Sequence, residues 1–180
     1  MSKTSLRDRS FALVMAGLFL FTALATSGVV IWSLINSNNS NKAVACKEIA
    51  VNNSTKLAGT CLSGFTPVNN NVTALQETDL KIGTGAVATA SSTVSVIYTG
   101  AVADTGVIFQ SSLDSGPQPI TFALNQVILG WQEGIPGMKV GGERRLLIPA
   151  AEAYGANPPA GSNIPANAAL VFDVTLLAVK

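Results

Sequence analysis

Few residues in this chain have side chains that could do acid–base or covalent chemistry. The 180 residues include no histidine, which removes the commonest general base and the commonest metal ligand. A Ser-His-Asp or Cys-His site is therefore impossible within the chain. The two cysteines, Cys46 and Cys61, cannot make a structural zinc site alone. Any chemistry must come from shape, apolar surface, carboxylates, hydroxyl groups or the backbone, and we expect no cofactor and no metal.

A tryptophan between glycines, Trp131 in the stretch GWQEGIPGM, stands out among the residues that remain. Apolar residues recur every four positions from Val127 to Ile135, which predicts a short helix over residues 126–135 with Asn125 as its N-cap. A helix of this length is marginal in water by itself. Another element must therefore pack against it.

That element is predicted to be a sheet, because residues 75–180 alternate between apolar and polar types. Period-two alternation is typical of strands with one buried face. The apolar rows are Val94, Val96 and Tyr98; Ile120, Phe122 and Leu124; Leu146 and Ile148; and Leu170, Phe172, Val174 and Leu176. Turn residues separate these rows. The fold class is α+β, with an antiparallel sheet and one short helix against its apolar face.

Five segments in this region resemble the FKBP-type peptidyl-prolyl cis–trans isomerases. They are IYTGAV (97–102), IFQSS (108–112), QVILGWQEGIPGMKVGGERRLLIP (126–149), AYG (153–155) and ALVFDVTLL (169–177). Each segment alone is a weak signal, but all five occur in the order and spacing of the family. The resemblance covers residues 75–180 and implies a twisted antiparallel sheet wrapped around the helix.

The resemblance also implies a site, an apolar pocket with Trp131 as its floor. Its walls would be Tyr98, Phe109, Val127, Ile128, Tyr154 and Phe172. In the family, the backbone at Ile128 and the hydroxyl of Tyr154 hold ligand carbonyl groups. Without the resemblance, Trp131, Phe109 and Phe172 would be read as ordinary core packing, and Tyr98 as a strand residue with its hydroxyl at the edge. Tyr154, beside a glycine in a loop, is less easily explained by packing. The implied partners are proline-containing polypeptides and macrolide inhibitors.

The residue types suit this activity on physical grounds as well. Rotation about an X-Pro bond must overcome a barrier of about 18–20 kcal/mol set by amide resonance. It needs no nucleophile, base or metal. A water-poor apolar pocket favours the twisted amide, which is less dipolar than the planar one, while positioned donors hold the flanking carbonyl groups.

Three departures from the family pattern bear on the site. Gln110 stands where the family has an aspartate that accepts hydrogen bonds, so we expect weakened macrolide affinity and lower catalytic efficiency. Ile120 stands where an aromatic residue lines the pocket, which predicts a less aromatic wall. In the loop before the last strand, Asn163 replaces an apolar residue, and Ile164 is expected to contact substrate. Arg144 and its neighbour are expected on a solvated strand face.

The N-terminal part predicts a membrane anchor. Residues 11–35 form an almost continuous apolar run, about 37 Å long as a helix against roughly 30 Å of bilayer hydrocarbon. Basic residues concentrate in residues 1–10, which places them in the cytoplasm and the remainder outside. A cleaved signal peptide with secretion of the domain is one alternative, and a lipoprotein attached at Cys46 is another.

Residues 36–74 are predicted to be a polar linker. An exported chain with an even number of cysteines favours a disulfide between Cys46 and Cys61, and two free thiols are the alternative. Residues 75–180 carry eight acidic and five basic residues, a net charge of −3, which argues against nucleic acid. The expected function is an outward-facing prolyl isomerase that acts on exported proteins. The alternative is a module that binds proline segments with little or no turnover.

Overall fold

The computed structural model describes residues 56–69 and 71–180 of the chain. These described residues belong to one compact unit. Its strands are β1 (Gln76–Lys81), β2 (Thr93–Val102), β3 (Ile108–Ser111), β4 (Ile120–Ala123), β5 (Glu143–Ile148) and β6 (Leu170–Val179). Its helices are the α-helix α2 (Leu129–Gly134) and the 3-10 turns η1 (Ser112–Ser115), η2 (Leu124–Gln126) and η3 (Ala150–Glu152).

The strands of the described region form one antiparallel sheet in the order β1-β5-β6-β2-β3, with β4 also paired to β2. Strands β4 and β3 share one edge of β2, since β4 pairs with Thr93–Val96 and β3 with Thr99–Ala101. Burial alternates along β2, β5 and β6, as the sequence predicts. The predicted fold class, an antiparallel sheet with one short helix, is confirmed. Strand β1 was not predicted, because all six of its residues are exposed.

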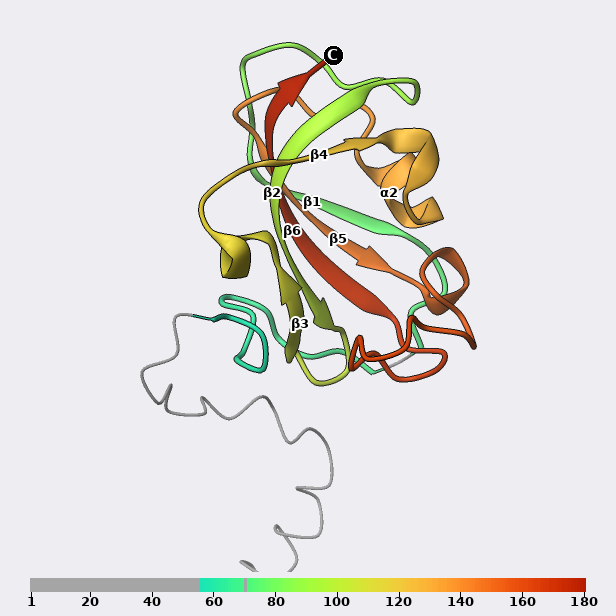
Figure 1. Cartoon of the computed structure of the whole chain (residues 1–180). Coiled ribbons are helices and arrows are strands. Elements are labelled where there is room, and N and C mark those ends of the chain that lie inside the picture. The colour runs from blue at the N-terminus through green and yellow to red at the C-terminus, as the bar shows by residue number, and fades with distance from the viewer. Residues whose placement is uncertain (1–55, 70) are drawn as a thin grey trace, which may run out of the picture. The chain divides into compact units, whose positions relative to one another are not determined.

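Helix α2 lies against the sheet on the side of the apolar core (Figure 1). It is shorter than the predicted 126–135, and the assignment of Asn125 as its N-cap is wrong. The chain is still extended at Val127 (φ −106°, ψ 176°), so the turn that contains Asn125 cannot continue into the helix. Ile128 occupies the N-cap position without a side-chain cap. Burial against the sheet, and not local capping, holds this helix in place.

The core between α2 and the sheet is built from the predicted alternating rows. Val94, Val96, Leu146 and Leu176 are fully buried there, together with Ile135 just after the helix. Burying a side chain of this size contributes about 1.5–3 kcal/mol. The short helix is therefore stable because the sheet supplies the apolar surface that it covers.

Residues 57–68, which we call the strap, cover the opposite face of the sheet. Within the strap, Leu57, Leu62 and Phe65 pack against a second apolar cluster that includes Ile108 and Val171. Val171 alternates along β6 with Phe172, which belongs to the core under α2, so the two clusters lie on opposite faces. The described part of the predicted linker is thus folded against the domain, because it carries apolar side chains that the sheet buries.

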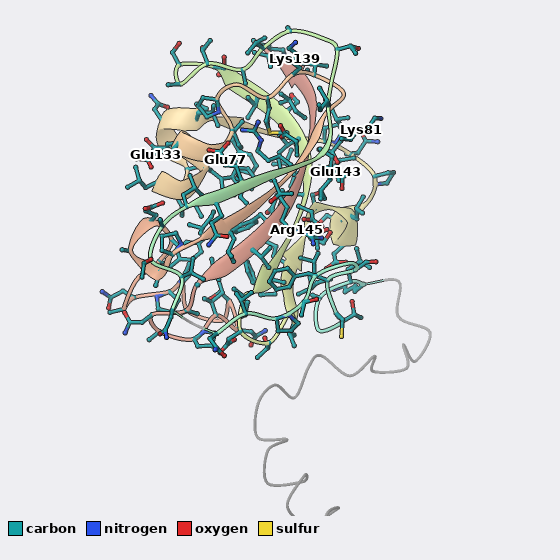
Figure 2. All side chains as sticks on the ribbon, turned by 180° about the vertical axis from the view of Figure 1, so that it is seen from behind. Glu77, Lys81, Glu133, Lys139, Glu143 and Arg145 are labelled. Atoms are coloured by element: carbon teal, nitrogen blue, oxygen red, sulfur yellow. The ribbon has the colours of Figure 1, made fainter. Side chains whose placement is uncertain are left out.

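The two arginines of β5 differ from the prediction of a solvated strand face. Arg144 is buried on the core side, with Nη1 2.6 Å from Glu77 Oε2 and Nε 2.7 Å from Asp79 Oδ1 on β1. Arg145, labelled in the view from behind in Figure 2, points to the strap side and pairs with Asp173 at 2.6 Å. The prediction failed because exposed β1 supplies carboxylates that allow a guanidinium to be buried.

Two predictions concern residues outside the described part of the chain. The anchor at residues 11–35 and the preceding cytoplasmic segment 1–10 lie there, as does Cys46. Between residues 56 and 180, apart from residue 70, no helix is long and apolar enough to cross a membrane. Cys61 carries no free thiol. Its backbone pairs with that of Val107 in an isolated antiparallel β-bridge. Its pairing with Cys46 stays a prediction.

Candidate functional site

The candidate site is a hollow of about 360 Å³ over the indole of Trp131. Three aromatic rings meet this indole nearly at right angles, at centroid distances of 5.3 Å (Tyr98), 5.5 Å (Phe172) and 5.8 Å (Phe122). Edge-to-face packing of this kind fixes the rings beyond what burial alone provides. The hollow is lined by Tyr98, Gln110, Phe122, Gln126, Val127, Ile128, Trp131, Tyr154 and Phe172.

The indole contributes its ring surface to this hollow and no hydrogen bond. Trp131 is only 4% exposed, and its Nε1–H is buried without a partner among the described residues. A ring held between perpendicular neighbours is a rigid apolar floor. Its size and flat shape suit a small saturated ring such as the side chain of proline.

Three unpaired donors surround this apolar floor. Within the described residues, the Ile128 backbone N–H has no acceptor, and the hydroxyl groups of Tyr98 and Tyr154 have no hydrogen-bond partner. These donors face an open hollow, where hydrogen bonds to water can be exchanged for hydrogen bonds to a ligand. These groups can therefore donate hydrogen bonds to carbonyl groups on either side of an apolar ring.

Local hydrogen bonds hold the segment before α2 in its extended form. The Gln132 side-chain amide donates to the Val127 carbonyl at 2.8 Å, and the Trp131 N–H donates to the Ile128 carbonyl at 2.9 Å. On the facing strand, the Tyr98 N–H donates to Ser112 Oγ at 3.0 Å. These bonds place the Ile128 amide and the Tyr98 ring at the pocket without a regular capping motif.

The pocket keeps the hydroxyl groups of its two tyrosines protonated. Burial raises the pKa of Tyr98 above its ordinary value of 10.0, and the nearby Tyr154 raises it further. Burial likewise raises the pKa of Tyr154. Both hydroxyl groups are therefore protonated at neutral pH and available as hydrogen-bond donors. Gln110, at the exposed end of the hollow, adds an uncharged amide.

The structure brings together most of the residues that the sequence nominated. The hollow contains Tyr98, Gln110, Val127, Ile128, Trp131, Tyr154 and Phe172. Phe109 is half-buried, packs edge-on against Phe172 at 5.7 Å and lines an adjoining cavity of about 350 Å³. Ile164 lines that cavity too. The roles of these residues in binding stay predictions.

One nominated residue lines neither the hollow nor the adjoining cavity, and two residues that line the hollow were missed. Ile120 is absent from the lining, and Phe122, two residues further along β4, faces the indole instead. The expected loss of aromatic wall is therefore wrong. The alternation of Ile120 and Phe122 put both on one face, so the sequence held the signal for Phe122. Gln126 lines the hollow as well, and nothing in the pattern pointed to it.

The comparisons with known proteins agree with this geometry. The model of the FKBP-type peptidyl-prolyl cis-trans isomerase family matches residues 69–177. The chain belongs to this family. The predicted resemblance to the FKBP-type isomerases is thereby confirmed. The match begins at residue 69, so the strap at residues 57–68 lies outside it.

Among individual FKBP-type proteins, FkpA of Aeromonas hydrophila is 50% identical over 113 residues, which cover 63% of this chain and 41% of the relative. A probable FK506-binding protein of Corynebacterium glutamicum is 49% identical over 100 residues, or 55% of this chain and 81% of the relative. The chain thus spans less than half of the first relative and most of the second.

A solved structure shares the fold. The peptidyl-prolyl cis-trans isomerase of Pseudomonas syringae pv. tomato is 36% identical and superimposes with a TM-score of 0.54, covering 63% of this chain and 80% of that one. The two chains therefore share the sheet and helix that build the pocket.

Proposed function

We propose that this FKBP-type domain accelerates cis–trans rotation about X-Pro bonds of polypeptides, with the proline ring seated on Trp131. The observation that carries this proposal is an indole enclosed by three perpendicular rings and bordered by donors that have no partner among the described residues. Substrate proline enters as an apolar ring, and its neighbouring carbonyl groups meet the Ile128 amide and the Tyr154 hydroxyl.

In this proposal the pocket acts on the amide without acid–base chemistry. The planar X-Pro amide is stabilised by resonance and by water, and both are lost as the bond turns. An apolar wall replaces that water. On entering the site, the less dipolar twisted amide therefore loses less solvation free energy than the planar amide. Each 1.36 kcal/mol of such differential binding speeds rotation tenfold. The donors keep the flanking chain in one shape while the bond turns.

Turnover of a proline tetrapeptide by the full-length chain, followed with a protease specific for the trans form, tests the proposal. The expected result is a relaxation rate that rises in proportion to protein concentration. A rate equal to the uncatalysed background at micromolar protein would refute it. The uncatalysed rotation takes tens to hundreds of seconds, so a faster catalysed rate is easy to distinguish from it.

A binding module with little turnover is the second candidate, and Gln110 favours it. At the exposed end of the hollow, this uncharged amide stands where the family has a carboxylate. Hydrogen bonds to polar groups of a ligand are weaker without the charge. The same change is expected to weaken the affinity for macrolides such as FK506. Peptide binding that saturates without any gain in isomerisation rate would select this second function.

We also propose that the domain is exported and held at the membrane by residues 11–35, so that it acts on exported proteins. The apolar run and the preceding basic residues support this. A disulfide between Cys46 and Cys61 would fit an oxidising compartment. Cell fractionation tests the anchor: the full-length chain should resist a carbonate wash. A shortened chain in the soluble exported fraction would show cleavage and secretion instead.

A further inference from the structure

A second, larger cavity of about 490 Å³ lies where β2 turns into β3, and the strap forms one of its walls. We call it the strap groove. The turn after β2 and the loop before β6 supply the other walls. Its lining includes Ala58, Val107, Ile108, Phe109 and Pro165, together with the polar Asp104, Thr105 and Asn163. The strap precedes the residues matched by the family model, so this one wall of the groove lies outside the matched region and the other walls lie within it.

The strap wall is held firmly by backbone hydrogen bonds. The Gly59 N–H donates to the Ile108 carbonyl at 2.7 Å, and the Ile108 N–H donates to the Thr60 carbonyl at 2.8 Å. The Asp114 carboxylate accepts from the backbone N–H groups of Leu57 and Ala58 at 2.5 and 3.1 Å. These bonds extend the sheet past the edge of β3 and form the groove without a ligand.

The strap groove and the cavity that adjoins the candidate site have one lining residue in common. Phe109 lines both the strap groove and the adjoining cavity of about 350 Å³. That cavity in turn shares Gln110 and Tyr154 with the hollow over the indole. Of these three hollows, the cavity of about 350 Å³ shares lining residues with both of the others, which share none with each other. Each has a volume within the range of about 300–1,000 Å³ that is typical of ligand sites.

We propose that the strap groove is a subsite for the substrate polypeptide and takes an apolar or basic residue several positions from the proline. This inference rests on the proposed function, since it assumes that a proline segment occupies the hollow over Trp131. Because lining residues are shared from the hollow over Trp131 to the cavity of about 350 Å³ and from there to the strap groove, the occupant proposed for the groove is the same polypeptide. Among the described residues that line the groove, Asp104 alone is charged, so an acidic residue is disfavoured there.

Peptide length separates this subsite from the proline pocket. Fluorescently labelled proline tetrapeptides are compared with peptides extended by four residues before or after the proline, each extension bearing one leucine, lysine or glutamate. Anisotropy with the full-length chain gives Kd, and the protease-coupled assay gives kcat/KM. One extended leucine or lysine peptide should bind at least about fivefold more tightly than the tetrapeptide, and the glutamate peptide should show no gain.

Two variants and a control locate the effect. Ala58→Trp fills the groove at an exposed residue of which only the backbone N–H is hydrogen-bonded, and it should abolish the gain while leaving tetrapeptide turnover unchanged. Thr66→Trp, on an exposed strap residue outside the groove, should keep the gain. Asp104→Asn should remove the preference for lysine over glutamate. This variant provides a second test of the groove if Ala58→Trp does not fold.

The outcomes separate the two proposals. No gain with length, or an equal gain in Ala58→Trp, would overturn the subsite. The same holds if Ala58→Trp changes only the oligomeric state, because the groove would then seat a second copy of the chain. A gain that Ala58→Trp abolishes, in a protein without tetrapeptide turnover, would instead refute the isomerase function and keep the subsite as part of a binding module.

Discussion

Gly130, next to Trp131, is the residue whose replacement tests how α2 is seated on the sheet. A Cβ atom added there would lie 2.8 Å from Cδ1 and 2.9 Å from Cγ1 of Ile148, which is fully buried on β5. Carbon atoms in contact prefer about 3.5–4.0 Å. Overpacking of this kind costs about 1–3 kcal/mol, whereas the helix propensity of alanine returns at most about 1 kcal/mol. Because Ile148 has no free space, Gly130→Ala should lower the free energy of unfolding by about 1–2 kcal/mol.

Urea unfolding of the full-length chain measures this difference, with Glu133→Ala as a control on the exposed side of the same helix. The control should stay within about 0.5 kcal/mol of the unsubstituted protein. In an Ile148→Ala background the clash is gone, so Gly130→Ala should stabilise by up to about 1 kcal/mol. A stabilising effect in the original background, or equal effects in both backgrounds, would refute the close contact of helix and strand.

Further changes test the site and its support. Gln110→Asp should raise kcat/KM by up to about fivefold, roughly 1 kcal/mol, by supplying a charged acceptor at the pocket, with Gln110→Asn as control; an unchanged or lower rate would contradict this. A profile of kcat/KM against pH should be flat from about pH 6 to 9, because the chain has no histidine and the pKa values of Tyr98 and Tyr154 are raised above 10.0; a bell centred near neutrality would show a titrating group. Those raised pKa values contribute stability that is complete below pH 10 and lost as pH rises through the folded-state values, which alkaline unfolding would show. Arg144→Met should cost about 1–3 kcal/mol of unfolding free energy, less than a fully buried pair, because its carboxylate partners are 40% and 45% exposed. The Arg144 hydrogen bond lowers the pKa of Asp79 below 3.8, so the stability from that pair is present above this pH and lost below it; acid unfolding of Arg144→Met should therefore be less steep, and an identical pH dependence would contradict the pairing.

The sheet could be predicted because its central strands each bury one face. The alternation of Val94, Val96 and Tyr98, and the row that includes Phe172, reports that burial directly in the residue types. Strand β1 has no buried face and therefore no such pattern, although it supplies the partners of Arg144. Buried arginine cannot be recognised from its own strand, because the carboxylates that make burial favourable come from an exposed strand far away in the sequence.

The candidate site could be predicted in outline but not at every wall. Trp131 and the segments around it carried enough of the family pattern to nominate the floor. Matching position within a short segment to the family favours Ile120, whereas it is Phe122, two residues further along β4 and paired with Val94, that reaches the indole. The strap could not be predicted as folded structure, since Leu62 and Phe65 are too widely spaced to show a periodicity.

Seating of proline on the Trp131 indole is the central claim, and turnover by indole-free variants tests it most directly. We would measure kcat/KM for a proline tetrapeptide with Trp131→Ala and Trp131→Leu, under conditions in which circular dichroism shows a native sheet for both. Truncation removes the floor of the hollow and costs about 3–5 kcal/mol of stability, which is why the bulkier leucine variant accompanies it. The account predicts a fall of at least about tenfold for Trp131→Ala, with Trp131→Leu between it and the original protein; undiminished turnover by a folded Trp131→Ala would contradict it.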